Sequence, residues 1–395
     1  MKAPFFEPGA VVIIGGGFAG LTTALSLSSF KNSPPIVLLD PCSKFVFLPL
    51  LYELLSGEMQ SWEVAPSYRT LLAGKGISFM QDSVESIDLL NKTVLTLSGQ
   101  LINFAQLVIS TGSKLETYGI PGVSEYAMKF NRLEDVAKLK RLINRLNALD
   151  SDNPALVIVG AGASGIELAC KSADLLNGHT QVHLVERGDR ILPNGKSFNQ
   201  EQALLALAKR KIKLHLNTKV LEVTAKTLEV LNSSDKELRT KFFTHQGLVW
   251  TAGSQPFFPP GMPKNIISRG GVLINETLRV VGMKNVFAIG DVAIDSNKPI
   301  VATAQLAMQQ AVLVASNIIS TRLEEPLKSF DFVDRGEILS LGIGEATITG
   351  LGITLSGPIA FQLRRLIYLS KMPSSFLGLR SAGVWLIESG KKFFN

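Results

Sequence analysis

A glycine-rich pattern that occurs twice constrains this chain more than any other feature. In the first copy, the apolar run 10–14 leads into Gly15, Gly17 and Gly20, and a second apolar run ends at Asp40. This order predicts a strand, a tight turn at Gly15, a close backbone approach to a pyrophosphate at Gly17, and a helix packed closely at Gly20. The helix N-terminus attracts phosphate, and Asp40 can accept a hydrogen bond from a ribose hydroxyl.

The second copy begins 145 residues later, at Gly160, and continues through Gly162 and Gly165 to an acid at Glu186. Two complete copies predict two dinucleotides, held by two separate doubly wound α/β domains. Glu186 favours NADH, because a carboxylate repels a 2′-phosphate. The neighbouring Arg187 leaves NADPH open.

Three further strand ends carry small or acidic residues. The runs 110–112 (Ser-Thr-Gly) and 251–253 (Thr-Ala-Gly) end buried strands, where small residues let the backbone lie close to a cofactor. The run 285–289 ends in Gly290 and Asp291, and Asp291 can accept a hydrogen bond from a ribityl hydroxyl or simply cap a helix. The uncharged helix predicted over 302–311 would direct a partial positive charge toward a flavin ring.

The composition favours a membrane surface over nucleic acid as the partner. The net charge is +7, the pI about 9.3, and 46% of the residues are hydrophobic. Low aromatic content and the lack of any nucleic-acid motif disfavour nucleic acid. The uncharged stretch 8–30 is interpreted as a strand–turn–helix rather than a membrane span, because it holds the glycine turn. The uncharged stretch 299–321 is interpreted as a buried helix rather than a lipid-exposed one, because it holds several amides. The four histidines show no ligand spacing, so no metal site is predicted.

The C-terminal region has a different pattern from the rest. Strands are predicted over 338–342 and 346–355, and an amphipathic helix over 358–369. Residues 358–395 hold one acid, Glu388, and six basic residues: Arg364, Arg365, Lys371, Arg380, Lys391 and Lys392. Basic residues beside apolar ones, with Trp385 among them, suit a helix in an anionic membrane interface. The alternatives are a dimer interface, as in a homodimer, or a cover over the cofactor.

The order of these motifs resembles that of the type II NAD(P)H:quinone oxidoreductases (type II NADH dehydrogenases) within the two-dinucleotide flavoproteins. The most specific part is the run Ala304-Gln305-Leu306-Ala307-Met308-Gln309. The segment 47–58 is similar to the cyanobacterial and plastid branch, which includes demethylphylloquinone (prenylquinone) reductases. The resemblance implies an FAD-binding domain over 1–118 and 256–330, an NAD(P)H-binding domain over 119–255, and a membrane-associating region over 331–395.

The resemblance also implies site residues. Glu167 matches a glutamate near the contact of nicotinamide and flavin, although an acid in the first turn of a helix is an equally simple interpretation. Gln305 and Gln309 match the quinone-side glutamines and share one helix face. FAD would contact Gly15, Gly17, Gly20, Asp40, Thr111 and Asp291, and NADH or NADPH would contact Gly160, Gly162, Gly165 and Glu186. The expected cofactor-binding residues further include Phe18, Ala19, Gly112, Gly253, Gly290, Ala304 and Gln305.

The implied activity is hydride transfer from NAD(P)H to FAD, followed by two-electron reduction of a membrane prenylquinone such as demethylphylloquinone or plastoquinone, without proton pumping. The implied location is peripheral (monotopic), on the cytoplasmic face of a plasma or thylakoid membrane.

Three other classes of protein compete with this interpretation. Disulfide and sulfide:quinone reductases require paired cysteines, but Cys42 and Cys170 lie in different predicted domains. A ferredoxin or rubredoxin reductase fits both glycine patterns but has no need of a basic, membrane-seeking tail. An FAD- and NADH-binding redox sensor would lack quinone-dependent turnover.

Overall fold

The computed structural model describes residues 9–150, 153–233, 240–268, 270–295, 297–298, 300–350, 352–373 and 378. The chain divides into two compact units. Unit 1 comprises 1–45, 65–114 and 254–333, and unit 2 comprises 46–64, 115–253 and 334–395. By this division the segment 46–64 groups with unit 2, whereas the sequence predicts it as part of the FAD-binding domain. The C-terminal region also groups with unit 2, whereas the sequence predicts it as a separate region. The binding functions of these domains remain predictions.

Unit 1 is built on a parallel sheet whose strands follow the order β19-β7-β1-β2-β3. Its core strands β1 and β7 are buried along their whole length, as expected for Val- and Ile-rich strands covered on both faces. Strands of this sheet are Val11–Ile14 (β1), Ile36–Asp40 (β2), Ile77–Gln81 (β3), Gln106–Ile109 (β7) and Val286–Ala288 (β19).

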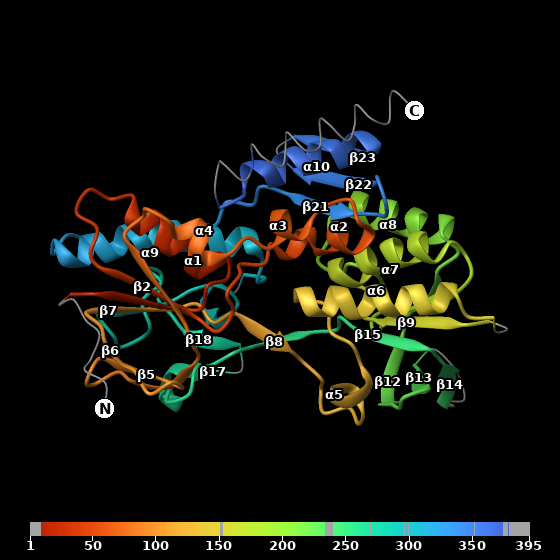
Figure 1. Cartoon of the computed structure of the whole chain (residues 1–395), viewed down its shortest axis with the longest axis horizontal. Helices are drawn as coiled ribbons and strands as arrows, with labels where there is room; N and C mark the ends of the chain where they lie inside the picture. The colour runs from red at the N-terminus through yellow and green to blue at the C-terminus, as the bar shows by residue number, and fades with distance from the viewer. Residues whose placement is uncertain are drawn as a thin grey trace. The chain divides into compact units, whose positions relative to one another are not determined.

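Helices α1 (Phe18–Ser28) and α9 (Ala304–Arg322) pack against each other beside this sheet (Figure 1). Thr303 caps α9, because its hydroxyl accepts the N–H of Leu306 at 3.1 Å. The remaining elements of unit 1 are short: α4 (Tyr68–Leu72), β4 (Val84–Asp88), β5 (Thr93–Thr96), β6 (Leu101–Asn103), β8 (Ser113–Leu115), β16 (Ser254–Pro256), η2 (Lys264–Ile266), β17 (Ile267–Ser268), β18 (Gly271–Leu273), η3 (Gly290–Val292) and β20 (Ala293–Ile294).

Unit 2 repeats the plan with a parallel sheet in the order β11-β10-β9-β15. Its strands are Ala155–Val159 (β9), Gln181–Val185 (β10), Lys213–His215 (β11) and Gly247–Trp250 (β15). An antiparallel sheet of Thr218–Val223 (β12), Thr227–Asn232 (β13) and Thr240–Thr244 (β14) adjoins them. The helical elements are η1 (Leu48–Leu50), α2 (Leu51–Ser56), α3 (Ser61–Val64), α5 (Val123–Tyr126), α6 (Leu133–Asn147), α7 (Ala163–Leu176) and α8 (Ser197–Lys209). Two doubly wound parallel sheets confirm the predicted α/β fold class.

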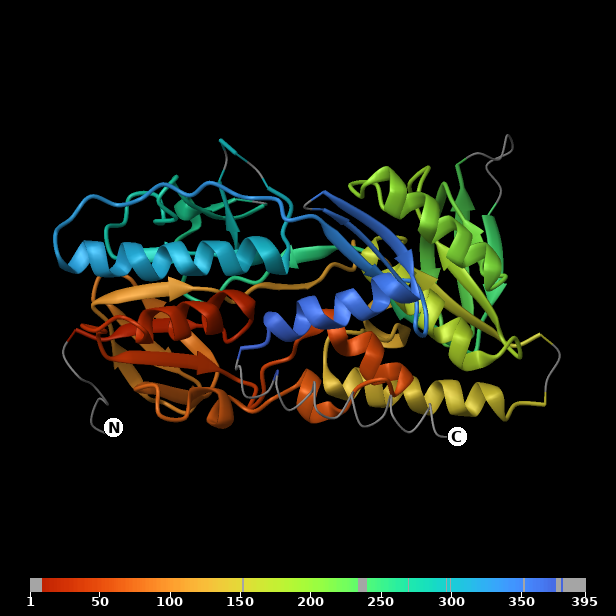
Figure 2. The same cartoon turned by 90° about the horizontal axis from the view of Figure 1, so that it is seen from above.

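The described C-terminal part of unit 2 contains an antiparallel sheet followed by helix α10. The strands are Glu337–Ser340 (β21), Ala346–Gly350 (β22) and Ile353–Gly357 (β23), and helix α10 spans Pro358–Ser370. Figure 2 shows α10 lying along this sheet. The predicted strand over 338–342 and the predicted helix are present, whereas the stretch predicted as a strand over 346–355 forms the hairpin of β22 and β23. Arg380, Trp385, Lys391 and Lys392 lie outside the described residues. Within the described ranges, no helix combines the length and the apolar character needed to cross a membrane.

Candidate functional site

The first glycine turn leaves space at one position and none at two others. Gly15 has a φ of +95°, and a Cβ added there would lie 2.3 Å from the backbone oxygen of Ser110. A Cβ on Gly20 would lie 1.8 Å from the backbone oxygen of Gly15, whereas a Cβ on Gly17 would meet nothing within 4 Å. The turn therefore requires glycine at Gly15 and Gly20 for packing, and leaves open space at Gly17 for a phosphate, as a dinucleotide demands.

Asp40 is held at this turn by two backbone groups. Its Oδ2 accepts the N–H of Gly16 at 2.7 Å, and its Oδ1 accepts the N–H of Cys42 at 2.7 Å. Behind the turn, the buried Tyr68 donates its hydroxyl to the backbone oxygen of Gly16 at 2.8 Å. These contacts fix the carboxylate where β2 ends, beside the expected phosphate position. Phe18, the first residue of α1, packs edge-on against Phe45.

The neighbouring strand ends converge on the same edge of the unit 1 sheet. After β7, the Ser110 hydroxyl lies 2.8 Å from the backbone oxygen of Ile14, and Ser113 donates its hydroxyl to Oδ2 of Asp291 at 2.8 Å. After β19, the N–H of Gly290 donates to Oε1 of Gln310 at 2.8 Å. The structure thus brings Asp291 to the strand end that contains Thr111 and Gly112. Thr111 itself donates to the backbone oxygen of Phe257.

Helix α9 places the two predicted glutamines near each other. Nε2 of Gln309 lies 3.4 Å from Oε1 of Gln305, and the same Nε2 donates to the backbone oxygen of Val333 at 2.9 Å. Oε1 of Gln309 also accepts the N–H of Val333 at 3.1 Å. The amide of Gln309 is therefore engaged with the chain that follows α9. A quinone carbonyl reaching Gln309 would have to replace one of these bonds.

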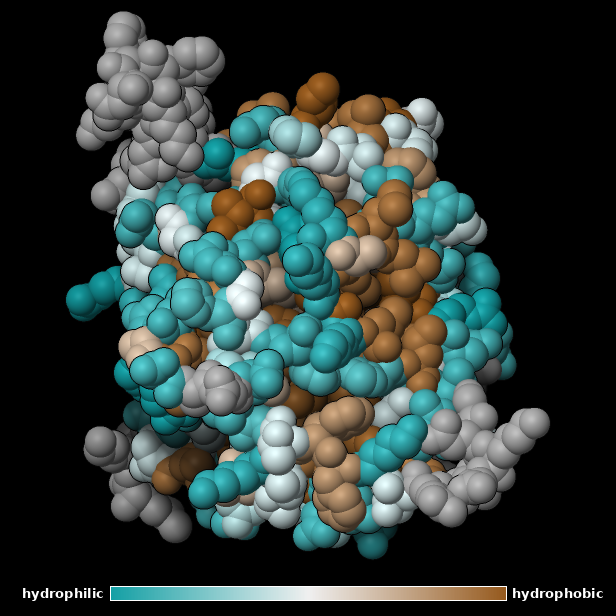
Figure 3. All heavy atoms as spheres, turned by 90° about the vertical axis from the view of Figure 1, so that its right-hand side faces the viewer, coloured by the Kyte–Doolittle hydropathy of each residue, from teal (hydrophilic) through white to brown (hydrophobic). Residues whose placement is uncertain are grey.

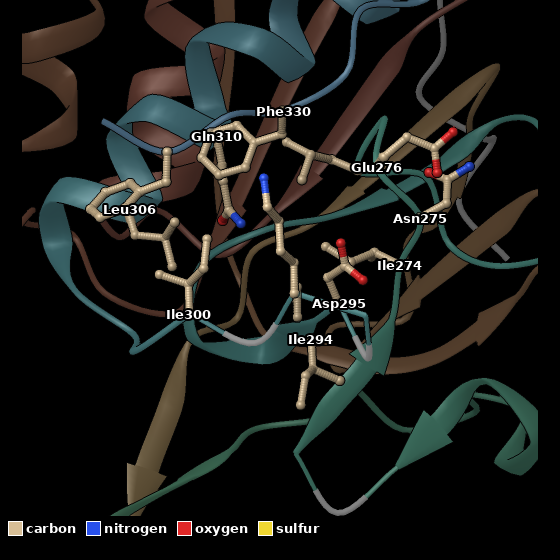
Figure 4. Close-up of a pocket in the computed structure, with 13 residues that line it drawn as sticks. Ile274, Asn275, Glu276, Ile294, Asp295, Ile300, Leu306, Gln310 and Phe330 are labelled. Atoms are coloured by element: carbon tan, nitrogen blue, oxygen red, sulfur yellow. The ribbon is translucent and has the colours of Figure 1, made fainter. Parts of the chain in front are cut away.

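A cavity of about 50 Å³ lies beside the start of α9 within unit 1 (Figure 4). Polar and apolar side chains contribute equally to its wall, and the amide of Gln310 is directed toward it. The space is enough for water but too small for a quinone ring, so we do not assign substrate binding to it. Lining residues include Ile274, Ile294, Ile300, Leu306, Gln310 and Phe330.

The second glycine turn, in unit 2, repeats the main features of the first one. Gly160 has a φ of +103°, and a Cβ on Gly165 would lie 1.7 Å from the backbone oxygen of Gly160, while Gly162 is open. Glu186 accepts the N–H of Ala161 and that of Gly188, both at 2.7 Å. The open space at Gly17 and at Gly162, each beside a fixed acid, fits one dinucleotide per unit.

Glu167 belongs to a buried ionic cluster in unit 2. Its Oε1 accepts the N–H of Ser340 at 2.8 Å and lies 3.7 Å from Nη2 of Arg364. Arg364, on α10, is completely buried and forms an ion pair with Glu53 of α2. Lys171, one turn after Glu167, pairs with Glu58. Three carboxylates thus share two cations, all of them buried except the partly exposed Glu58, and we call these five residues the buried ionic cluster.

Burial raises the pKa of Glu167 to about 7, although Arg364 and the N–H of Ser340 oppose the rise. The carboxyl group therefore gains or loses a proton close to neutral pH. An acid in the first turn of an exposed helix would keep an ordinary pKa, so the structure disfavours that simpler interpretation of Glu167.

Replacing Glu167 by glutamine is expected to flatten the pH dependence of stability. The folded-state pKa of about 7 lies above the ordinary value of 4.5, so the stabilising contribution of this carboxyl is complete below pH 4.5 and is lost as the pH rises through 7. In that window the free energy of unfolding should fall with a slope approaching about 1.4 kcal/mol per pH unit from this group. Urea unfolding of both proteins at several pH values measures the slope, and an equal slope in E167Q would contradict the expectation.

Several residues of these sites were not identified from the sequence. Tyr68, Ser113 and Gln310 support the unit 1 turns from distant parts of the chain, and their partners could not be inferred without the fold. The sequence places Arg364 among the basic residues of a helix at a membrane interface, and this interpretation is wrong for Arg364, because its side chain is completely buried against Glu53. Its place on the apolar face of the helix, at a spacing of four from Ala360, was the available signal.

Comparisons with known proteins agree with this geometry. Residues 9–311 match the family described as pyridine nucleotide-disulphide oxidoreductase. The chain is 36% identical over 378 residues to demethylphylloquinone reductase NdbB of Synechocystis sp., covering 92% of each chain. It is 33% identical over 420 residues to the alternative NAD(P)H-ubiquinone oxidoreductase C1 of Arabidopsis thaliana, covering 96% of this chain and 80% of that one.

Among solved structures, NDH2 of Plasmodium falciparum in complex with NADH has the same fold, with a TM-score of 0.84 at 18% identity over 94% of this chain and 97% of that chain. The chain therefore belongs to the pyridine nucleotide-disulphide oxidoreductase family, in its branch of FAD-dependent NAD(P)H:quinone oxidoreductases.

Proposed function

We propose that this flavoenzyme takes a hydride from NADH or NADPH and passes two electrons to a prenylquinone in the membrane, without proton pumping. The observation that carries the proposal is the pair of glycine turns, each open to a phosphate and each beside an acid held by two backbone N–H groups. One unit then holds the electron carrier and the other the electron donor.

FAD bound in unit 1 supplies the two-electron chemistry between nicotinamide and quinone. Gly17 and the N-terminus of α1 bind its pyrophosphate, and Asp40 binds its adenosine ribose. Asp291, oriented by the Ser113 hydroxyl, binds the ribityl chain. The N-terminus of α9, at Ala304, directs its partial positive charge toward the ring.

In unit 2, Gly162 and the N-terminus of α7 bind the pyrophosphate of NAD(P)H, and Glu186 binds its adenosine ribose. Glu167 lies in the same unit, and because its pKa is near 7 its carboxyl can accept or donate a proton near neutral pH during the transfer from nicotinamide to flavin. Gln305 binds the quinone carbonyl, with Gln309 beside it. The substrate class, a prenylquinone such as demethylphylloquinone, is proposed from the name of the Synechocystis relative.

A surface of unit 2 supports peripheral attachment to a membrane. Ile359 is 72% exposed and Leu366 60% exposed, both on α10, and Ile353 of β23 is 43% exposed. In Figure 3 hydrophobic residues gather at the top edge, where β23 and α10 lie in Figure 1. Apolar side chains on a basic protein suit a helix lying at an anionic membrane surface. We propose the cytoplasmic face of a plasma or thylakoid membrane for this attachment.

Thiol chemistry is a second candidate function, and the structure disfavours it. Cys170 is buried in α7, and burial raises the pKa of its thiol to about 12, which keeps it protonated and unreactive. Cys42 is exposed, but the other cysteine of the sequence is the buried Cys170, so the two do not offer a pair of accessible thiols.

The test is steady-state oxidation of NADH and NADPH by the purified FAD-loaded protein with naphthoquinone and benzoquinone acceptors in anionic vesicles. We expect quinone-dependent turnover. For the prenylated acceptors, turnover should be higher with vesicles than without vesicles. Reduction of the bound flavin without reoxidation by any quinone would instead support the redox-sensor alternative.

A further inference from the structure

Two half-buried histidines at the edge of the unit 2 sheet have no role in the activity described so far. Nδ1 of His183, on β10, lies 2.9 Å from Nε2 of His215, on β11. The two ring planes differ by 1°, and the ring centres are 5.1 Å apart. Face-to-face rings would keep about 3.5 Å or more between their atoms, so these rings lie edge to edge in one plane, with one nitrogen of each directed at the other. We call these two residues the histidine pair.

The geometry of the histidine pair fits a shared hydrogen rather than a metal ion. Facing nitrogens 2.9 Å apart are at the distance of a hydrogen bond, in which one neutral imidazole donates its N–H and the other accepts it. A zinc ion between two facing nitrogens would need about 4 Å from one nitrogen to the other, because each Zn–N bond is about 2.0 Å long. An imidazolium ring has a donor at both nitrogens, so the hydrogen bond is lost once both rings are protonated.

The surroundings of the histidine pair favour its neutral form. Burial lowers the pKa of His183 to about 4, and His215 and Lys213 lower it further. Burial also lowers the pKa of His215, and Lys213 of β11 and Lys241 of β14 add to this effect. In the described part of the chain these two lysines are the charged groups that act on the pair from neighbouring elements, and no carboxylate is among them. Phe243 of β14 packs against both rings, with its ring centre 5.6 Å from that of His183 and 4.7 Å from that of His215.

These pKa values define the pH range in which the bond between the histidines is lost. The folded-state pKa of His183, about 4, lies below the ordinary value of 6.5. The stabilising contribution of the neutral pair is therefore complete above pH 6.5 and is lost as the pH falls toward 4.

The histidine pair joins two strands beside the acid of the nucleotide site. β11 is a three-residue strand at the edge of the sheet, so a side-chain bond to β10 contributes a large share of its attachment. The backbone oxygen of His215 accepts the N–H of Glu186 at 2.8 Å, and the backbone oxygen of Gly188 accepts the N–H of Asn217 at 2.8 Å. The backbone from Glu186 to Gly188 is thus held by β11 and by the residues that follow it.

We propose that the histidine pair makes the dinucleotide affinity of unit 2 depend on pH. With the pair neutral, β11 is bonded to β10, and Glu186 stays where it accepts the N–H of Ala161 and that of Gly188. With both rings protonated, two cations repel each other at this short distance, the strands separate at the edge, and Glu186 loses the backbone support of His215. Acidification therefore weakens nucleotide binding and slows reduction of the flavin. The inference rests on the proposed nucleotide site of unit 2 and not on the identity of the electron acceptor.

Calorimetric binding of ADP-ribose to the FAD-loaded protein at pH 7.5 and at pH 5 tests the proposal without any quinone. ADP-ribose contains the pyrophosphate and the adenosine ribose but no nicotinamide, so the flavin stays oxidised. For the unchanged protein we expect the affinity to fall by about tenfold from pH 7.5 to pH 5. For H183N/H215Q we expect a fall of less than about twofold, because the two amides can keep a hydrogen bond between the strands but do not titrate.

The matched control is H179Q, which removes an exposed histidine of the same unit. It should show the same tenfold fall as the unchanged protein. An equal fall in H183N/H215Q, or an affinity of the unchanged protein that does not depend on pH, would overturn the proposal. Lack of ADP-ribose binding at pH 7.5 would overturn the nucleotide site of unit 2 and this inference with it. Lack of quinone reduction would overturn the proposed function but would leave the calorimetric result for the histidine pair intact.

A second measurement does not require the double variant to fold. The chain has four histidines, so nitrogen NMR of protein labelled at histidine can resolve each ring. We expect a scalar coupling between the two facing nitrogens at pH 7.5, and this coupling should disappear as the pH falls toward 4. Its absence at pH 7.5, or its persistence in acid, would contradict the proposal.

Discussion

Replacing Arg364 by methionine is expected to lower the free energy of unfolding by about 3–5 kcal/mol, because it removes the cation paired with the buried Glu53 and leaves only the more distant Lys171, 3.9 Å away, of the two cations in the buried ionic cluster. Arg364 is completely buried, pairs with Glu53, and donates through Nη2 to the backbone oxygen of Pro49 at 2.7 Å. Methionine fills a similar volume but supplies no charge and no donor. Chemical unfolding followed by circular dichroism measures the loss.

Two further variants separate this explanation from a simple packing defect. R190M removes an exposed ion pair with Asp189 and should cost less than about 1 kcal/mol. Adding E53Q to R364M should recover part of the loss, because the second change removes the uncompensated charge that the first one creates. If R364M/E53Q is no more stable than R364M, the cost lies in packing and the ionic explanation is wrong.

Alanine at the two kinds of glycine in each turn should have opposite consequences. A Cβ at Gly165 would lie 1.7 Å from the backbone oxygen of Gly160, so G165A must displace backbone and should cost about 3 kcal/mol of stability. A Cβ at Gly162 meets no protein atom within 4 Å, so G162A should fold normally. It should nevertheless bind NADH much more weakly, because the methyl group occupies the space left for the pyrophosphate.

The same pair exists in unit 1, at Gly20 and Gly17, where bound FAD provides the readout. G17A should purify as a folded protein with little FAD, whereas G20A should be unstable even with FAD added in excess. Absorbance at the flavin band and thermal unfolding measure the two effects. Normal FAD content in G17A would show that the open space at Gly17 is not the phosphate position.

The parts of the site that are local in sequence could be predicted, and the parts that depend on distant contacts could not. Both turns and both acids follow from a fixed spacing within one strand–turn–helix–strand unit, and the α/β class follows from their repetition. Tyr68 and Gln310 are ordinary core residues in sequence, and only folding brings them to Gly16 and Gly290.

Arg364 shows the limit of reading charge from composition. A run of basic residues on an amphipathic helix indicates a membrane surface on average, but it does not say which residue turns inward. Arg364 contacts two acids, Glu53 and Glu167. These acids lie on helices that are more than a hundred residues apart from each other and from α10 in sequence. Long-range charge pairing of this kind has no local signal.

Asp40 and Glu186 each accept two backbone N–H groups, and this limits how nucleotide preference can change during evolution or engineering. Each carboxylate accepts backbone N–H groups from two successive loops and so holds the glycine turn in place, in addition to the ribose contact proposed for it. A glutamine at position 186 has one oxygen acceptor where the loops present two N–H donors, and its NH₂ group would face one of them. A change that gains selectivity for NADPH by removing Glu186 would therefore weaken the hydrogen bonds that hold the glycine turn. Changes at the adjacent Arg187 would leave these hydrogen bonds intact.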